Sequence, residues 1–288
     1  MVDAITDIHT HVNPLFMLNP GARKVFADQH EDFDAIERVV ADPAQVVEHM
    51  DEAGVSRIGL VNYVSPDVTG YTQEVNDWVA QYASVAPDRF IPFGSVDPHY
   101  TEDCAAEVDR LHAMGIQALK IHPPHQLLYA NDYRDGGGLP NLEGVYRRAS
   151  ELGMPVMVHT GTSIFPKARN KYGDSMALDD VIVDFPDLQL ILAHGGRPLW
   201  MREALFLLRR RSGVYIDISS LPPGRLLTYF PDLERIADKV LYGSDWPAPG
   251  PSTLRSNIDA VLDLPIGEDA KSKILRDNAE KLFGPVRS

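Results

Sequence analysis

The segment Ala4-Ile5-Thr6-Asp7-Ile8-His9-Thr10-His11 joins a short apolar stretch to two histidines that are separated by one residue. Side chains of an extended strand alternate between its faces, so His9 and His11 project from the same side. Two imidazoles at the end of a strand can bind one metal ion together. The alternative is two ordinary histidines in a loop that leads to Pro14. The rest of the sequence decides between these interpretations, according to whether it completes a coordination sphere.

The composition is that of a soluble globular protein of 288 residues, with 44% apolar and 24% charged residues. The formal net charge of −14 argues against nucleic acid or an anionic membrane as partner, because both attract basic surfaces. Cys104 is the single cysteine, which excludes an intrachain disulfide and a thiolate metal cluster. We find no signal-peptide pattern and no apolar run of membrane-spanning length. The expected location is therefore the cytoplasm.

Apolar stretches alternate with helical patterns along the whole chain. The predicted strands are residues 4–8, 55–61, 89–96, 116–122, 155–159, 188–194, 214–218 and 240–242. The predicted helices are residues 32–40, 43–54, 73–85, 102–114, 142–152, 178–185, 199–211, 223–237, 252–262 and 268–282. Long loops are expected at 11–42, 123–140 and 160–175. Eight strand–helix units in this length predict a (β/α)8 barrel, forming a single domain over residues 1–288.

Ionisable side chains fall where the predicted strands end. In a barrel of parallel strands all these ends meet at one rim, where active sites of this fold are built. Imidazole and carboxylate ligands without thiolates suit zinc, manganese or another divalent ion, and an open position for water would make the site catalytic. The residues concerned are His9 and His11 (first strand), Lys120 and His122 (fourth), His159 (fifth), His194 (sixth) and Asp245 (after the eighth).

These motifs resemble those of the amidohydrolase superfamily. The matching segments are His9-Thr10-His11, His159, His194-Gly195-Gly196 and Ser244-Asp245-Trp246-Pro247. Within the superfamily the chain is most similar to the amidohydrolase-related (amidohydrolase-2) group. That group includes aminocarboxymuconate-semialdehyde decarboxylase, resorcylate decarboxylases and lactone hydrolases. The resemblance spans the whole chain, but it does not specify the reaction.

The resemblance implies that His9, His11, His159 and Asp245 bind one divalent metal ion, expected to be zinc, with manganese as the alternative. His194 would then act beside the metal as a general acid/base, and Asp245 would share that proton transfer. His159, His194 and Asp245 each also have an alternative interpretation, in which the residue has a structural role only. His159 and His194 would be hydrogen-bonded core histidines, and Asp245 would cap the helix that follows it.

Three further residues are predicted to bind the substrate. Lys120 is expected to bind a carboxylate or another oxyanion. The alternatives are a structural ion pair and the carboxylated lysine that bridges two metals in some superfamily members. His122 shares its face of the strand with Lys120, and His125 follows it; a loop role is the alternative for both histidines. Arg197 follows the paired glycines, and its guanidinium suits two-point recognition of a carboxylate.

The leading functional hypothesis is metal-dependent hydrolysis of a small ester, lactone or amide that carries a carboxylate. Metal-bound hydroxide would attack the carbonyl carbon. The alternative is non-oxidative decarboxylation of an aromatic or unsaturated acid, which would use the same residues. A non-catalytic scaffold is a third hypothesis, which loss of the ligand positions would favour, and none is lost. The expected partner is a small molecule, and relatives commonly form dimers.

Overall fold

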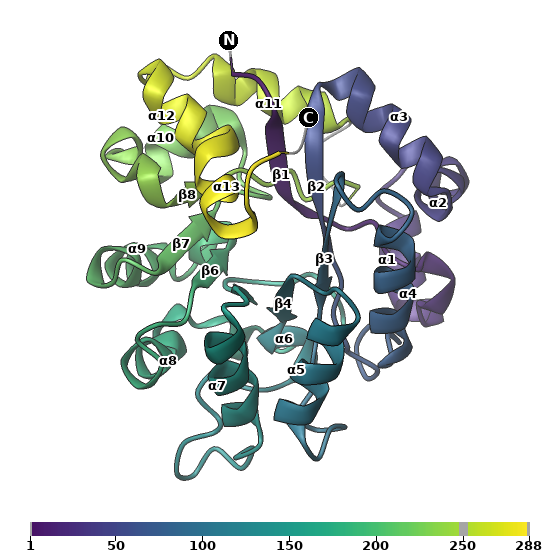
Figure 1. Ribbon diagram of the computed structural model, residues 1–288, viewed down its shortest axis with the longest axis vertical. Helices are drawn as coiled ribbons and strands as arrows, with labels where there is room; N and C mark the ends of the chain where they lie inside the picture. Colours follow the sequence, from purple (N-terminus) through teal and green to yellow (C-terminus); the bar gives the residue numbers. More distant parts are fainter. Residues whose placement is uncertain (1, 248–252, 287–288) are drawn as a thin grey trace.

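Residues 2–247 and 253–286 are described by a computed structural model of the protein. Eight parallel strands lie in sequential order, each paired with the next. Figure 1 shows the helices arranged around these strands. The strands are β1 (Ile5–Thr10), β2 (Val55–Val61), β3 (Phe90–Gly94), β4 (Ala118–Ile121), β5 (Val156–His159), β6 (Leu190–Ala193), β7 (Val214–Asp217) and β8 (Val240–Leu241).

Backbone hydrogen bonds join the first strand to the last. The Ile8 amide donates to the Tyr242 carbonyl at 3.0 Å, the Asp245 amide to the His9 carbonyl at 2.8 Å, and the His11 amide to the Trp246 carbonyl at 2.7 Å. This seam brings the two ends of the sheet together in a nearly closed barrel. The predicted (β/α)8 fold is confirmed.

The helices between the strands are mostly short. They are α1 (Pro20–Ala27), α2 (Phe33–Ala41), α3 (Pro43–Ala53), α4 (Glu74–Ala83), α5 (Cys104–Ala113), α6 (Pro123–Gln126), α7 (Leu142–Leu152), α8 (Leu178–Asp184), α9 (Met201–Arg210), α10 (Leu226–Tyr229), α11 (Leu254–Leu262), α12 (Glu268–Ser272) and α13 (Asn278–Phe283). Local signals set their ends, as α3 shows. The Asp42 side chain accepts from the Ala44 amide, Pro43 fills the first position, and Gly54 adopts the left-handed C-cap with φ of 69°.

Two apolar layers fill the molecule. The larger layer packs the outward side chains of the strands against the surrounding helices. The smaller one lies inside the barrel and joins strand residues such as Phe93 to Ala279 and Phe283. Since the Phe283 and Gly284 carbonyls accept from Arg57, near the start of β2, α13 covers the N-terminal end of the barrel. The opposite end is left for the site.

Several predicted boundaries differ from the structure. The predicted loop 11–42 contains α1, which Asn19 caps through the Ala22 amide, and the predicted loop 123–140 begins with α6. The predicted helix 223–237 is broken into 3-10 turns (Pro223–Arg225, Leu233–Lys239) and α10. A π-helical turn (Lys273–Asp277) separates α12 from α13. The predicted start of the helix 252–262 lies outside the described residues, and α11 begins at Leu254.

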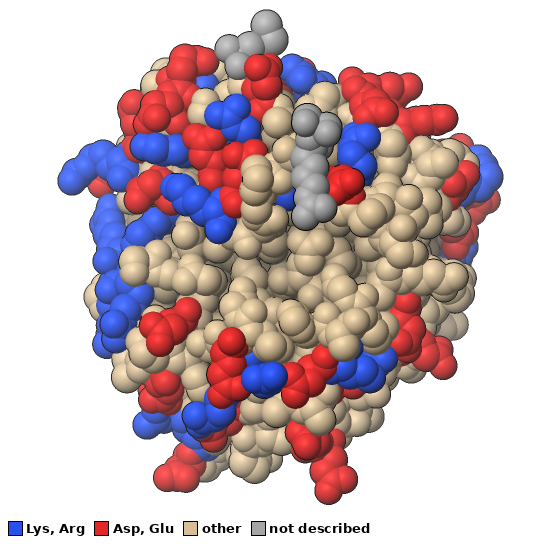
Figure 2. All heavy atoms as spheres, in the orientation of Figure 1, with Lys and Arg blue, Asp and Glu red and all other residues tan. Residues whose placement is uncertain are grey.

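The surface carries charges of both signs. On the face shown in Figure 2, acidic and basic side chains are interspersed around the rim, and few charged side chains lie near its middle. Among the described residues, no helix is both long enough and apolar enough to span a bilayer.

Candidate active site

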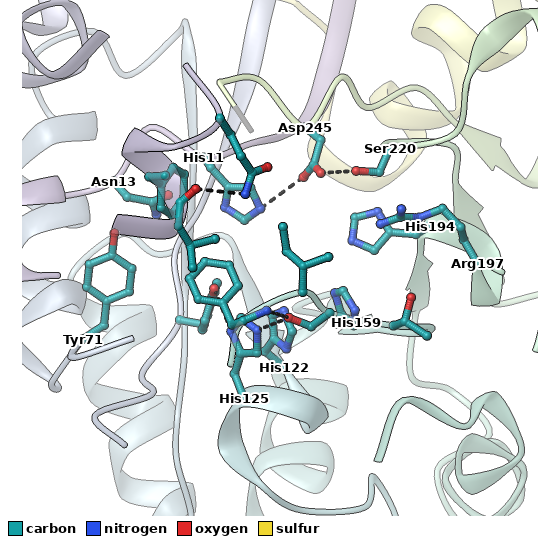
Figure 3. A pocket seen from close by; sticks show the side chains of 18 residues that line it. His11, Asn13, Tyr71, His122, His125, His159, His194, Arg197, Ser220 and Asp245 are labelled. Atoms are coloured by element: carbon teal, nitrogen blue, oxygen red, sulfur yellow. Dashed lines mark hydrogen bonds and ion pairs between the residues drawn. The ribbon is translucent and has the colours of Figure 1, made fainter. Parts of the chain in front are cut away.

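A cavity of about 350 Å³ lies where the strands end, and His11, His159, His194 and Asp245 line it (Figure 3). Its volume falls in the lower part of the range for small-molecule sites. Two long segments complete its walls, one after β1, which includes α1, and one after β5. They contribute Asn13, Val25, Phe26 and Gln29 from the first segment, and Thr162, Ser163, Ile164 and Phe165 from the second.

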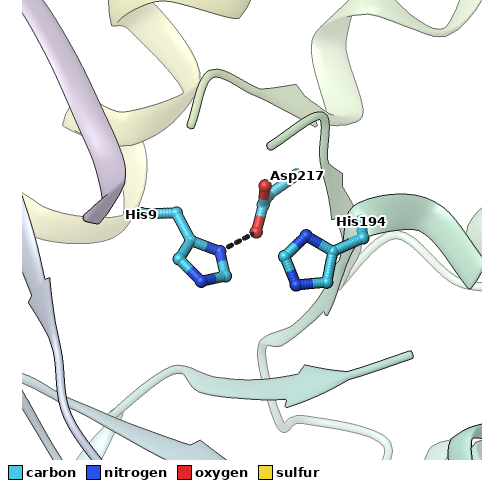
Figure 4. A group of neighbouring side chains, drawn as sticks. All are labelled: His9, His194 and Asp217. Atoms are coloured by element: carbon cyan, nitrogen blue, oxygen red, sulfur yellow. Dashed lines mark hydrogen bonds and ion pairs between the residues drawn. The ribbon is translucent and has the colours of Figure 1, made fainter. Parts of the chain in front are cut away.

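His9 is buried on β1 beside a carboxylate at the end of β7. Its Nδ1 lies 2.6 Å from Asp217 Oδ2 (Figure 4). Burial raises the pKa of Asp217, but the charge and hydrogen bond of His9 outweigh this effect and hold the pKa at about 2. An ionised acceptor places the proton of His9 on Nδ1, which leaves Nε2 as a free lone pair. A carboxylate that orients a ring nitrogen in this way is typical of metal-binding histidines.

The free nitrogen of His9 faces the group formed by His11 and Asp245. Asp245 Oδ1 lies 3.1 Å from His11 Nε2 and 3.5 Å from His9 Nε2. The other oxygen, Oδ2, accepts from the Ser220 hydroxyl. The three ligand atoms lie within 4.8 Å of one another, close enough to share one ion. The structure thus brings together three of the four predicted metal ligands.

His159, the fourth predicted ligand, ends β5 on the same cavity floor. Its ring lies 4.7 Å from the ring of His194, between centroids. Burial lowers its pKa well below the usual range, which keeps the imidazole in the neutral form that binds metals. Within the described chain, His159 is in neither of the tight groups of ligand atoms, His9–His11–Asp245 and His9–His194–Asp217.

Unpaired polar atoms test whether these residues suit a metal ion. His9 Nε2, His159 Nε2 and Asp245 Oδ1 are buried and have no hydrogen-bond partner in the part of the chain that the structure describes. Each such atom costs on the order of 1–3 kcal/mol when it is left uncompensated. A divalent cation would satisfy His9 Nε2 and Asp245 Oδ1 together, because both belong to one tight group of ligand atoms, and His159 lines the same cavity. The donor set fits one divalent metal ion.

His194 follows β6 in the left-handed conformation, with φ of 63°. Its Nδ1 lies 2.9 Å from Ser219 Oγ and 3.2 Å from the Ser219 carbonyl oxygen. Burial lowers its pKa to about 3, so the ring is neutral at pH 7. Ser219 occupies Nδ1, and Nε2 is left for the cavity that His194 lines. This arrangement suits a residue that moves a proton.

Backbone strain concentrates at this site. Five described residues other than glycine have positive φ angles. Three of them border the site: His194 (63°), directly after β6, and Ser220 (55°) and Asp245 (69°), a few residues after β7 and β8; the other two are Ala4 and Leu127. Such angles are uncommon for residues with a side chain, and they cluster at functional sites.

The residues predicted to bind substrate occupy different depths. His122 and Arg197 line the cavity, and Arg197 is half-buried with an unpaired Nε. Lys120 is fully buried on β4, and its ammonium has no hydrogen-bond partner among the described residues. Burial lowers its pKa to about 8, against the opposing charges of Asp217 and Asp245. Because Lys120 is not among the lining residues, its predicted contact with substrate remains a prediction.

The sequence patterns do not reveal the residues at the end of β7 and just after it that hold the site together. Asp217 orients His9, Ser219 bonds His194, and Ser220 bonds Asp245. Asp217 had a usable signal, since it is a carboxylate near the end of a predicted strand, like the residues that were singled out. The two serines had none, because their partners depend on the path of the loop.

Comparisons with known proteins show the family and the fold of the chain. A family model described as amidohydrolase matches residues 6–284. An uncharacterised TIM-barrel protein from Bordetella bronchiseptica is 24% identical, with a TM-score of 0.74 over 97% of this chain and 98% of that chain. No sequence among the curated proteins matches the chain.

Two further solved structures share the fold at lower identity. A 5-carboxyvanillate decarboxylase from Novosphingobium aromaticivorans, in complex with manganese and 4-hydroxy-3-methoxy-5-nitrobenzoic acid, is 18% identical, with a TM-score of 0.70 over 98% of this chain and 96% of that chain. A probable 2-pyrone-4,6-dicarboxylic acid hydrolase from Acinetobacter baumannii, with citric acid bound, is 18% identical, with a TM-score of 0.66 over 98% and 99%.

The family model covers nearly the whole chain, including both halves of the barrel seam. The resemblance that the sequence motifs indicate is therefore confirmed, and so is the prediction that the protein is an enzyme of this superfamily. The chain belongs to the amidohydrolase family and is a metal-dependent enzyme of that superfamily.

Proposed function

We propose that the protein is a metal-dependent decarboxylase of a small aromatic or unsaturated carboxylic acid. The observation that carries this proposal is the composition of the cavity, in which Phe26, Tyr63 and Phe165 stand near the polar floor that Arg197 borders. A flat, apolar body with one carboxylate matches such a cavity. Similarity to the manganese-containing 5-carboxyvanillate decarboxylase supports decarboxylation over the hydrolysis that we favoured from the sequence.

The metal would be held by His9, His11, His159 and Asp245. Nitrogen and oxygen ligands of this kind suit zinc and manganese alike. When bound, the ion supplies a Lewis acid that holds and polarises substrate oxygens. Asp217 keeps the proton of His9 on Nδ1, and Ser220 fixes Asp245 so that Oδ1 faces the two histidines.

The side chains around the metal group divide the remaining tasks. Arg197 binds the carboxylate and orients the ring. The bond between the ring carbon and the carboxylate then breaks, its electron pair stays on the carbon, and carbon dioxide leaves. The carbon takes up a proton from water in its place, and His194 and Asp245 relay that proton. The neutral His194 ring, held at Nδ1 by Ser219, would accept the proton at Nε2 and pass it to the carbon.

Hydrolysis of a carboxylate-bearing lactone is the second candidate. The same residues can activate water, and the similar Acinetobacter protein is described as a probable hydrolase of such a compound. The two reactions differ in their products, so an experiment separates them.

The test is a screen of the metal-loaded protein against single-ring aromatic acids labelled with ¹³C at the carboxylate, beside a set of lactones. We expect labelled carbon dioxide from at least one acid, loss of this activity with a chelator, and recovery with zinc or manganese. His194→Ala should lower the rate by at least about 100-fold. Ring opening of a lactone without any release of carbon dioxide would contradict the proposal and support the hydrolase.

A further inference from the structure

Tyr63, His125 and Ser163 form a hydrogen-bonded chain in the cavity wall. The Tyr63 hydroxyl lies 3.1 Å from His125 Nδ1, and His125 Nε2 lies 2.6 Å from Ser163 Oγ. The three residues come from three segments, which follow β2, β4 and β5, and all three line the cavity. No metal ligand takes part in this chain.

The hydrogen bonds of the chain leave one hydroxyl hydrogen without an acceptor. Burial lowers the pKa of His125 to about 3, so its ring carries one N–H and one bare nitrogen. If Tyr63 donates to Nδ1, then Nε2–H donates to Ser163, which also accepts from the Phe165 amide at 3.2 Å. The Ser163 hydrogen is then free. If the ring is the other tautomer, Ser163 donates to Nε2, and the Tyr63 hydrogen is free.

Either tautomer therefore presents one O–H donor without an acceptor in the described part of the chain. Both hydroxyls border the cavity, so the acceptor must come from a molecule inside it. Tyr63 is buried and Ser163 partly buried, so a donor left without a partner there carries a free-energy cost that a suitable ligand oxygen removes. This makes the chain a point of recognition for an oxygen atom.

A stack of imidazoles fixes where that oxygen would lie. His125 stacks on His122 at 3.6 Å, and His122 stacks on His159 at 3.9 Å, with ring planes inclined by 14° and 16°. One imidazole therefore separates the chain from the predicted metal ligand His159. A single ring can extend along this wall from the metal group to the free hydroxyl. The oxygen would then be a ring substituent remote from the reacting carboxylate.

The charges around the cavity restrict the nature of that substituent. Among its lining residues within the described ranges, Arg197 is the one lysine or arginine, and it borders the polar floor beside His194. At the Tyr63–His125–Ser163 end the lining groups are neutral; the charge of the buried Lys120 acts on His125, but Lys120 does not line the cavity. A second carboxylate there would be desolvated without a cation in contact with it, at a cost that a neutral oxygen avoids. The cavity is therefore suited to a monoacid.

We propose that the Tyr63–His125–Ser163 chain selects aromatic monoacids that carry a second, uncharged oxygen substituent, such as a hydroxyl, on the ring. This inference rests on the proposed function for the position of the reacting carboxylate. Tyr63 and Ser163 are specificity-determining residues, and His125 positions them.

Calorimetric titration of the metal-loaded protein with benzoate, the three monohydroxybenzoates and isophthalate tests the proposal. The best hydroxybenzoate should bind about three- to tenfold more tightly than benzoate, as one net hydrogen bond allows, and isophthalate more weakly than both. The tautomer of His125 decides whether Tyr63 or Ser163 carries the free hydrogen. The variant that removes this hydroxyl, Tyr63→Phe or Ser163→Ala, should abolish the preference, and the other variant should reduce it. The affinity for benzoate should change by less than about twofold in both variants.

Tyr71→Phe is the matched comparison: its hydroxyl also lines the cavity, is buried and has no hydrogen-bond partner among the described residues, but it lies outside the chain, so its removal should leave the preference intact. The proposal is wrong if no ring acid binds, if isophthalate binds best, or if Tyr71→Phe alone abolishes the preference. Because binding is measured without turnover, a hydroxyl preference in a protein that releases no carbon dioxide would reject the proposed function and retain this inference. Release of carbon dioxide without such a preference would support the proposed function and reject this inference.

Discussion

At the scale of the residue, Asp217 is the side chain on which the state of His9 depends. Asp217→Asn removes the ionised acceptor of His9 Nδ1 while it keeps the size of the side chain. We expect metal affinity to fall by about 10- to 100-fold, as for other partners of metal-binding histidines. Competitive titration of zinc against a chromophoric chelator measures this affinity.

A matched control makes the same substitution, aspartate to asparagine, at a position outside the site. Asp232→Asn breaks an exposed ion pair with Arg209 at 3.2 Å and should leave metal affinity unchanged. Equal affinities for the Asp217→Asn and unmodified proteins would show that Asp217 does not orient His9.

Cys104 gives a prediction with a defined pH dependence. It is 2% exposed, and burial, followed by the nearby carboxylates Asp97, Asp103 and Glu107, raises the pKa of its thiol to about 12. Since the thiolate is the reactive form, the folded protein should resist alkylation by iodoacetamide at pH 8 and react faster as the pH rises toward 12. Unfolded protein should react at once. Mass spectrometry counts the adducts, and rapid, complete labelling of the folded protein would contradict this prediction.

Single residues also show what the sequence could and could not reveal about the site. His9, His11 and Asp245 were predicted because their residue types carry the chemistry and each lies near the end of a strand. Ser219, Ser220 and Tyr63 were not, because a hydroxyl acquires a role only from its neighbours. Those neighbours are 25 residues away in the Ser219–His194 and Ser220–Asp245 pairs, and 62 residues away in Tyr63–His125.

At the scale of the element, the loop after β5 is anchored against the segment after β6. Gly161 has φ of 104°, and a Cβ added there would lie 2.0 Å from the Arg197 carbonyl oxygen. Gly161→Ala should therefore displace Arg197 and destabilise the protein by about 2 kcal/mol. Denaturant unfolding measures the stability, and benzoate titration should show weaker binding.

Gly224→Ala provides the comparison, because a Cβ there meets no atom within 4 Å and its φ is not positive. It should leave both stability and binding nearly unchanged. If Gly161→Ala behaved in the same way, the close approach of the two loops would not be needed to place Arg197.

The elements also mark the limit of sequence patterns for this fold. All eight strands were predicted because their runs are apolar on both faces, as strands covered by helices require. Helix α1 was missed within 11–42 because Pro20 and Gly21 read as loop residues, although Pro20 occupies the first turn, where proline is tolerated. The region 223–237 has apolar residues at helical spacing, yet it folds as short turns.

At the scale of the whole molecule, metal binding and stability are expected to be coupled. A ligand present at 100 times its dissociation constant stabilises the folded state by about 2.7 kcal/mol. A chelator should therefore lower the Tm by about 5 °C. Addition of zinc or manganese should restore the Tm, with one ion per chain by elemental analysis.

Asp245→Asn should abolish the response to the chelator, because it alters a ligand of the His9–His11–Asp245 group. An unchanged Tm for the unmodified protein in the presence and absence of metal would contradict a resident ion. Two ions per chain would contradict the one-metal prediction and direct attention to Lys120.

The seam between β1 and the segment after β8 has a consequence for biosynthesis. His9 and His11 are synthesised before the seven strand–helix units that separate them from Asp245, which the Asp245–His9 backbone bond places beside them. A nascent chain therefore holds its histidines without their carboxylate until all these units have been made. Chains that stop before Asp245 lack the full ligand set, so metal capture would select for chains that extend past it.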